Sequence, residues 1–181
     1  MTFALTRPFS RMVAGAIFAL AATTAFAQES TNQVANNTDW YVFEENASGK
    51  QCWVVSKPKQ TVNTDTAGRT KNVSRGEILF FVSYAPASGM NGQVSFAGGY
   101  PFAPGSEVTL SIGGTNYALF TEGETAWSTS PQDDARIVAA MKRGAEATLT
   151  GRSARDTVTK DTFSLSGFTA SVDDAAQRCG A

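Results

Sequence analysis

The chain has 181 residues, of which 15 are basic and 16 acidic, and it contains no histidine. It therefore lacks the commonest general base, the usual partner of a nucleophilic serine or cysteine, and the usual ligand of first-row metals, which argues against an ordinary hydrolase. The slightly acidic balance argues against nucleic acid or an anionic membrane surface as the main partner.

The first 27 residues have the three parts of a cleavable export signal. Arg7 and Arg11 are positive, residues 12–22 are apolar but shorter than the roughly 20 residues of a membrane span, and residues 25–27 (Ala-Phe-Ala) form a small-x-small cleavage pattern. We expect cleavage there and a soluble, periplasmic or secreted mature protein; a retained N-terminal anchor is the alternative. Loss of the two arginines leaves 13 basic against 16 acidic residues, a net charge of −3.

Removing 27 of the 181 residues leaves 154, the size of one domain. Residues 28–39 are polar and without periodicity, which predicts a flexible leader before a single domain over residues 40–181. Short β-prone runs follow, each bounded by Gly, Pro, Asn or Ser. They are Trp40–Phe43, Cys52–Ser56, Ile78–Tyr84, Gln93–Phe96, Val108–Ile112, Asn116–Phe120, Ala147–Thr150 and Thr162–Phe168. This number of strands in one domain predicts a mainly β fold, a β-sandwich, with a tight hairpin at Gly113-Gly114.

One segment predicts a helix, over residues 131–143. Ser130 can cap it, Pro131 suits its first position, Asp133 completes a capping-box geometry, and Gly144 ends it. Its apolar face is formed by Ile137, Val138 and Met141, so the helix should lie on the sandwich. A shorter helical turn, capped by Ser171, is expected over residues 171–178, and the longest loop over residues 58–76.

The only two cysteines are Cys52 and Cys179. A pair of redox-active or metal-binding thiols is the alternative to a disulfide, but there is no Cys-x-x-Cys spacing and no histidine to complete a zinc site. The pair therefore predicts one structural disulfide that closes nearly the whole domain, stabilises it by up to about 5 kcal/mol, and indicates an oxidising compartment.

Several short segments occur in a recognisable order along the mature chain. They are Asp39-Trp40, residues 51–56 (Gln-Cys-Trp-Val-Val-Ser), 99–102 (Gly-Tyr-Pro-Phe), Ala126-Trp127, 152–155 (Arg-Ser-Ala-Arg) and 161–168 (Asp-Thr-Phe-Ser-Leu-Ser-Gly-Phe), before the terminal cysteine. This set resembles the invasion-associated locus B family of exported alphaproteobacterial proteins. The resemblance implies an immunoglobulin-like β-sandwich, a periplasmic or secreted location and, in intracellular pathogens, a link to host-cell entry; it implies no enzyme activity. The chain departs from the family pattern at Asp156, where a glycine usually follows the second arginine.

Arg152, Arg155 and Lys160 are the candidate partner-binding residues. They lie close together in sequence on an acidic protein, and such a basic hairpin could contact an anionic partner. Salt bridges to Asp156 and Asp161 across the hairpin are the alternative explanation of the same charges.

Other groups have a functional and a structural interpretation. The aromatic residues could form a platform for a sugar or peptide, or fill the core; they are Trp40, Trp53, Tyr100, Phe102 and Trp127. Asp133 and Asp134 could bind a cation, but helix capping explains them. Ser153 and Lys160 could form a nucleophile pair, an arrangement that chance also produces.

The sequence thus predicts a non-enzymatic binding module whose partner is a protein or an envelope component. We expect no catalytic residue, no metal site and no cofactor. A structural or stress-protective envelope protein without a host ligand is the alternative, and an enzyme is the third hypothesis.

Overall fold

The computed structural model describes residues 32–47 and 49–181, so the expected export signal lies outside the described residues. In this part, eleven antiparallel strands form one sheet in the order β1-β2-β3-β5-β6-β9-β8-β7-β10-β11-β4. The strands are β1 (Gln33–Asn37), β2 (Trp40–Glu45), β3 (Gln51–Ser56), β4 (Gln60–Thr64), β5 (Leu79–Ala85), β6 (Met90–Ala97), β7 (Glu107–Ile112), β8 (Thr115–Glu122), β9 (Thr125–Trp127), β10 (Glu146–Arg152) and β11 (Val158–Ser164). The helices are η1 (Pro86–Ser88), α1 (Pro131–Arg143) and α2 (Phe168–Cys179).

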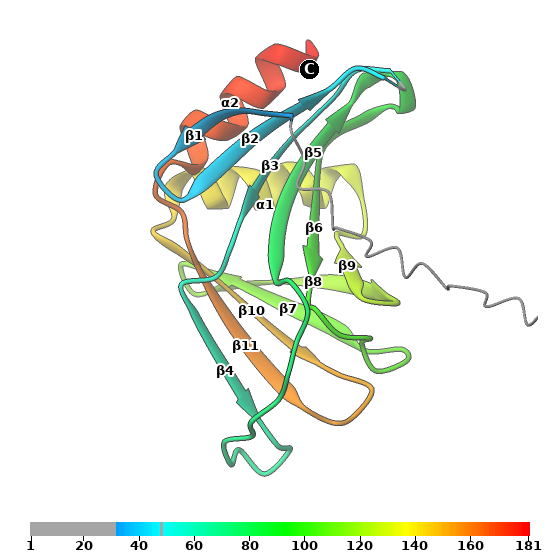
Figure 1. Ribbon diagram of the computed structural model, residues 1–181, viewed down its shortest axis with the longest axis vertical. Coiled ribbons are helices and arrows are strands. Elements are labelled where there is room, and N and C mark those ends of the chain that lie inside the picture. Colours follow the sequence, from blue (N-terminus) through cyan, green and yellow to red (C-terminus); the bar gives the residue numbers. More distant parts are fainter. Residues whose placement is uncertain (1–31, 48) are drawn as a thin grey trace, which may run out of the picture.

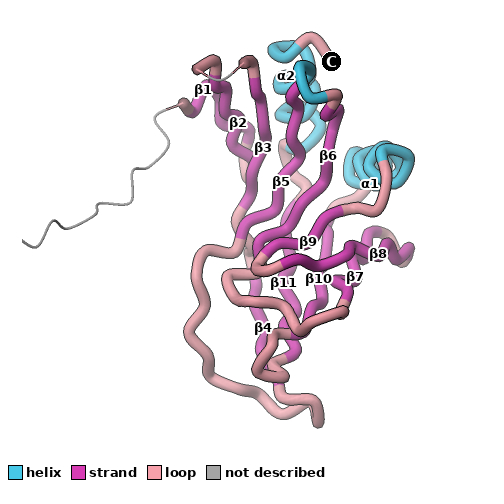
Figure 2. The backbone as a smooth tube through the Cα atoms, turned by 90° about the vertical axis from the view of Figure 1, so that its right-hand side faces the viewer, coloured by secondary structure: helices cyan, strands magenta, loops and turns pink. Residues whose placement is uncertain are grey.

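The sheet bends so strongly that its two parts pack against each other (Figures 1 and 2). Phe80 of β5 and Phe96 of β6 both contact Phe163 of β11, with ring centroids 5.4 and 6.1 Å apart. The predicted mainly β fold of the sandwich type is therefore confirmed, and its two layers are parts of one continuous sheet. The predicted hairpin at Gly113-Gly114 is also present: Ile112 pairs with Thr115, and both glycines have positive φ (55° and 82°).

Strict alternation along the strands separates an inner from an outer surface. Val42, Val54, Val82 and Val94 are fully buried and lie directly opposite one another across β2, β3, β5 and β6. Each such side chain stabilises the fold by about 1.5–3 kcal/mol relative to exposure. The residues that alternate with these valines along each strand consequently point away from the core.

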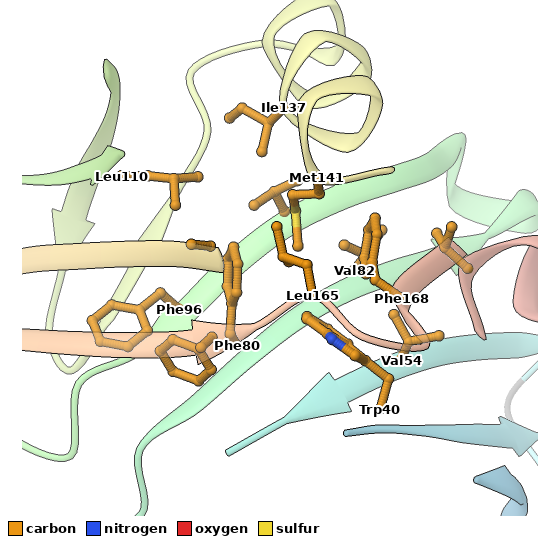
Figure 3. Close-up of a cluster of buried hydrophobic side chains, with 14 of the residues drawn as sticks. Trp40, Val54, Phe80, Val82, Phe96, Leu110, Ile137, Met141, Leu165 and Phe168 are labelled. Atoms are coloured by element: carbon orange, nitrogen blue, oxygen red, sulfur yellow. The ribbon is translucent and has the colours of Figure 1, made fainter. Parts of the chain in front are cut away.

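Both helices cover the inner face (Figure 3). The boundaries of α1 agree with the prediction: the Ser130 hydroxyl accepts a hydrogen bond from the backbone N–H of Asp133 at 3.1 Å, and Ile137 and Met141 are buried. Trp40 packs edge-on against Phe168 of α2, with ring centroids 4.8 Å apart. No helix among the described residues is long and apolar enough to cross a lipid bilayer.

The second helix differs from the prediction, because it begins at Phe168 rather than at Ser171. Ser171 is buried inside the helix, where its hydroxyl accepts a hydrogen bond from the Asn37 amide at 3.1 Å. The predicted strand Thr162–Phe168 therefore ends at Ser164. At its other end, α2 carries Cys179 to Cys52 of β3, and the two are joined by a disulfide with their Cα atoms 5.9 Å apart.

Three strands have no counterpart in the sequence prediction: β1, β4 and β9. The prediction of a flexible leader over residues 28–39 is wrong for residues 33–37, which form β1 and pair with β2. Likewise, β4 lies in the expected loop 58–76 and pairs with β11. Both are edge strands without a buried side chain, so neither has the apolar alternation that identifies a strand in sequence.

Candidate functional site

A cleft of about 490 Å³ lies beside the turn between β10 and β11. Four segments far apart in sequence line it: the connection from β4 to β5, the connection from β6 to β7, the turn between β8 and β9, and the β10–β11 turn with the start of β11. Figure 1 shows where these segments run. The lining residues are Lys71, Asn72, Val73, Ser74, Arg75, Gly99, Tyr100, Pro101, Glu124, Ser153, Ala154, Arg155, Thr157 and Thr159.

A buried ion pair fixes one wall of the cleft. The Arg75 guanidinium donates to both carboxylate oxygens of Asp161, at 2.8 and 2.7 Å, and the two side chains are only 6% and 0% exposed. It also donates twice to the Gly98 carbonyl, at 3.0 and 2.7 Å, and lies 4.9 Å from the centroid of the Tyr100 ring. Because these partners satisfy its donors and neutralise its charge, Arg75 anchors the loop and is not free for a ligand.

Tyr100 continues this wall. Its hydroxyl lies 2.6 Å from the hydroxyl of Thr159, and its ring packs edge-on against Phe102 at 4.9 Å. Burial raises the pKa of the Tyr100 phenol, so the group stays neutral at physiological pH. The phenol is therefore a fixed neutral part of the wall.

The cationic groups of the rim are Lys71 and Arg155. The Lys71 ammonium donates to the backbone carbonyl of Arg155 at 3.4 Å, so the two segments touch. Within residues 32–47 and 49–181 neither side chain has an ion-pair partner, and Glu124 is the one carboxylate in the lining. The rim thus carries a net positive charge suited to an anionic group.

The three basic residues identified from the sequence are divided between two surfaces. Arg155 lines the cleft. Arg152 and Lys160 are exposed on the outer surface of the β10–β11 hairpin, where Lys160 lies opposite Thr150. Arg152 forms an ion pair with Asp156 at 2.7 Å, which matches the structural interpretation for this pair.

Asp161 does not pair with the hairpin, because its side chain points inward and meets Arg75 instead. Sequence reasoning did not identify Arg75 or Lys71 as members of a site, and it considered Tyr100 only as part of an aromatic platform. A signal was nevertheless available: Asp161 alternates with Thr159 and Phe163, so it faces the core, and a buried carboxylate requires a cationic partner.

Helix capping explains Asp133 but not Asp134. Hydrogen bonds from Thr129 and Ser130, and then the contact with Arg136, lower the pKa of Asp133 to about 2. Asp134 is buried, which raises its pKa, and it accepts hydrogen bonds from the backbone N–H of Val94 at 2.7 Å and from the Ser128 hydroxyl. It therefore ties α1 to β6.

The remaining candidates are also placed. Trp40 and Phe102 are buried, Tyr100 lines the cleft, and Trp53 and Trp127 lie on the outer face of the sheet. The hydroxyl of Ser153 accepts hydrogen bonds from backbone N–H groups of its own turn, at 3.3 and 3.1 Å, and is not brought to Lys160. Among the described residues, no group of three or more Cys, Asp and Glu side chains is arranged to hold a metal ion.

Comparison with known proteins identifies a solved structure of similar fold and a matching protein family. The crystal structure of invasion associated protein B from Bartonella henselae is similar, with a TM-score of 0.50 and 13% sequence identity over 79% of this chain and 95% of that one. At this identity the likeness shows the fold alone. No curated protein sequence matches the chain. The family model of the invasion associated locus B (IalB) protein matches residues 40–176, more than half of the chain, and the chain therefore belongs to the IalB family.

Proposed function

We propose that the chain is an exported, non-enzymatic binding module that contacts an anionic group of a protein or envelope component through the cleft rim. The observation that carries the proposal is the meeting of Lys71 and Arg155, two cations without ion-pair partners among the described residues, at one cleft. Exposed charges of this kind steer encounter and accelerate association. A role in host-cell invasion is supported by the family description alone.

The absence of histidine supports a role in binding rather than acyl transfer or hydrolysis. Two of the hydroxyl groups that line the cleft are engaged by neighbours: Ser153 accepts from its own turn, and Thr159 lies 2.6 Å from the Tyr100 hydroxyl. Neither has a general base beside it, which an activated nucleophile needs.

Export is part of the proposal. It rests on the Ala-Phe-Ala pattern at residues 25–27 and on the disulfide between Cys52 and Cys179. Protein recovered from the periplasmic or secreted fraction should begin at Gln28 and show no free thiol on alkylation under denaturing, non-reducing conditions. Two alkylated cysteines would contradict this part of the proposal.

The binding proposal is tested with two double variants of equal charge change. Lys71→Ala/Arg155→Ala removes both rim cations, whereas Arg152→Ala/Lys160→Ala removes two exposed cations from the other surface of the hairpin. Binding of labelled, purified protein to bacterial envelope fractions and to cultured host cells is measured at increasing salt concentrations.

We expect the rim variant to bind about tenfold more weakly, mainly through slower association, and to lose most of the salt dependence. The hairpin-surface variant should bind like the parent. Equal losses in both variants would place the contact on the hairpin as a whole. If the parent shows no saturable binding, the alternative of a structural or stress-protective envelope protein is favoured.

A further inference from the structure

The outer face of the sheet bears a row of five apolar residues and one serine. Helices α1 and α2 lie on the inner side of β2, β3, β5 and β6, so the outer side of these strands faces the viewer in Figure 1, and Figure 2 shows α1 on one side of the strands. Among the described residues, no helix or strand packs on that side.

The strand register aligns the row. Each of its members lies directly opposite the next on the neighbouring strand, and we call this set the aromatic row: Tyr41, Val55, Phe81, Ser95, Trp127 and Phe120. None of the six belongs to the core cluster. A second aromatic pair on the same face, Phe43 and Trp53, is stacked at 5.4 Å with an interplanar angle of 4°.

Phe120 and Trp127 form the most exposed end of the row. Their rings stack with centroids 5.7 Å apart, and Phe120 remains 43% exposed. The other members of the row are half-buried, so each keeps part of its side chain at the surface. Apolar surface that remains exposed in this way marks interaction sites, because covering it removes apolar area from water at about 25 cal/mol per Å².

The charges beside this pair select the partner. Glu107 of β7 lies directly opposite Phe120 of β8. Glu122 lies two residues after Phe120 on the same strand and therefore on the same face. Both are exposed, and neither forms an ion pair within the described residues. Aromatic faces attract cations, and two adjacent carboxylates reinforce that attraction while they repel an anionic surface.

We infer that the aromatic row is a second binding surface, which takes an extended, basic segment of a partner protein. An Arg or Lys side chain of the segment lies over the Phe120–Trp127 pair between Glu107 and Glu122, and apolar side chains follow the row toward Tyr41. An extended segment suits this surface because its alternate side chains all point toward the sheet. The surface differs from the cleft rim in its residues and in the sign of its charge.

The probe is a capped, fluorescein-labelled peptide of about nine residues, a length chosen to span several strands at ~4.8 Å per strand. Arginine stands at its first position, valine at every second position after that and serine between them, so that the arginine and the valines share one face of the extended chain. Its counterpart has glutamate in place of the arginine. Binding to the purified protein is followed by fluorescence anisotropy for the parent, Glu107→Gln/Glu122→Gln and Phe120→Ser. The matched controls are Glu146→Gln, an exposed carboxylate on β10, and Val62→Ser, an exposed apolar residue on β4.

We expect the parent to bind the basic peptide at least ~10-fold more tightly than the acidic one. The double glutamine variant should lose most of this preference, and Phe120→Ser should weaken binding ~5-fold or more. The two controls and Lys71→Ala/Arg155→Ala should bind like the parent, which separates this inference from the proposed function. The substituted residues are exposed, except for Lys71, which is half-buried, and the thermal unfolding of all variants is measured alongside.

Equal affinity for the two peptides, or equal losses in the controls, would overturn the inference. The assigned occupant would also be wrong if Phe120→Ser left peptide binding unchanged but abolished a concentration-dependent dimer of the parent in sedimentation, or abolished binding of a neutral oligosaccharide. The first result would identify a second copy of the chain as the occupant, and the second a sugar.

Discussion

Arg75 and Asp161 form a bidentate ion pair that connects the loop after β4 to the inner side of β11. Their side chains are 6% and 0% exposed, so neither charge has water as an alternative partner. The pair joins residues 86 positions apart in sequence and holds one wall of the cleft. Integrity of the site therefore depends on a contact that is itself inaccessible to a ligand.

Asp161→Ala should lower the free energy of unfolding by about 3–5 kcal/mol, because it leaves the buried guanidinium without its counter-ion. Urea unfolding measures this loss. Asp173→Ala is the matched control, since it breaks the exposed ion pair with Lys142 (side chains 59% and 37% exposed) and should cost less than about 1 kcal/mol. Equal costs would mean that the Arg75 pair is as solvated as the surface pair.

Gly167, with φ +85°, is the N-cap residue immediately before α2, and a Cβ at this position would lie 1.9 Å from the backbone oxygen of Asn37. Gly167→Ala should therefore displace β1 from α2 and cost ~3 kcal/mol or more, by adding a steric clash to the strain of a left-handed residue. Gly180, at the other end of the helix, has φ +67°, but a Cβ added there would have no atom within 4 Å. Gly180→Ala should therefore cost only about 1–2 kcal/mol. Thermal and urea unfolding of both variants test the difference.

The elements predicted correctly from the sequence are those specified by neighbouring residues. Ser130, Asp133 and Gly144 determine α1 locally, and Val108, Leu110 and Ile112 alternate because β7 has one buried face. Edge strands β1 and β4 bury no side chain, so their sequences lack the apolar alternation of a strand. They are strands because they pair with a neighbouring strand.

The same reasoning explains the part of the site that was missed. Arg155 was identified because it lies in a basic segment, but its cleft partner Lys71 is 84 positions away, and Arg75 is 86 positions from Asp161. These contacts depend on the path of the β4–β5 connection. The need for glycine at position 167, immediately before α2, likewise arises from the close approach of Asn37, a contact between residues far apart in sequence.

The two neighbouring carboxylates at the start of α1 should have opposite effects on acid stability. Hydrogen bonds from Thr129 and Ser130 lower the folded-state pKa of Asp133 to about 2, so its contribution is present above the unfolded value of 3.8 and is lost as the pH falls toward 2. Burial raises the pKa of Asp134, so its folded form binds a proton more readily, and its cost to stability diminishes as the pH falls through its folded-state pKa.

Asp133→Asn should therefore be less stable than the parent at about pH 6, and this difference should shrink toward about pH 2. Asp134→Asn should show the opposite trend, with its stability relative to the parent decreasing on acidification. Urea unfolding across this pH range measures both. If the two variants show the same trend, acid stability is governed by groups outside this helix start.

Asp156 occupies the turn of the β10–β11 hairpin with φ +55°, in the left-handed region. Glycine, the residue expected here from the family resemblance, would adopt this conformation without steric cost. The steric cost of this backbone conformation at Asp156 is offset in part, because its carboxylate accepts a hydrogen bond from Arg152 at 2.7 Å. That ion pair is exposed, so it contributes only about 0.2–1 kcal/mol.

Asp156→Gly should change the free energy of unfolding by less than about 1 kcal/mol, because relief of backbone strain offsets the lost ion pair and the greater freedom of the unfolded chain. Asp156→Ala loses the same ion pair but keeps the strained φ, so it should be less stable than the glycine variant by about 1–2 kcal/mol. Urea unfolding of the two variants side by side measures this difference. Equal stability would show that the turn relaxes out of the left-handed region when the carboxylate is removed, and the position of Arg155 at the cleft rim would then depend on the Arg152–Asp156 pair rather than on the backbone.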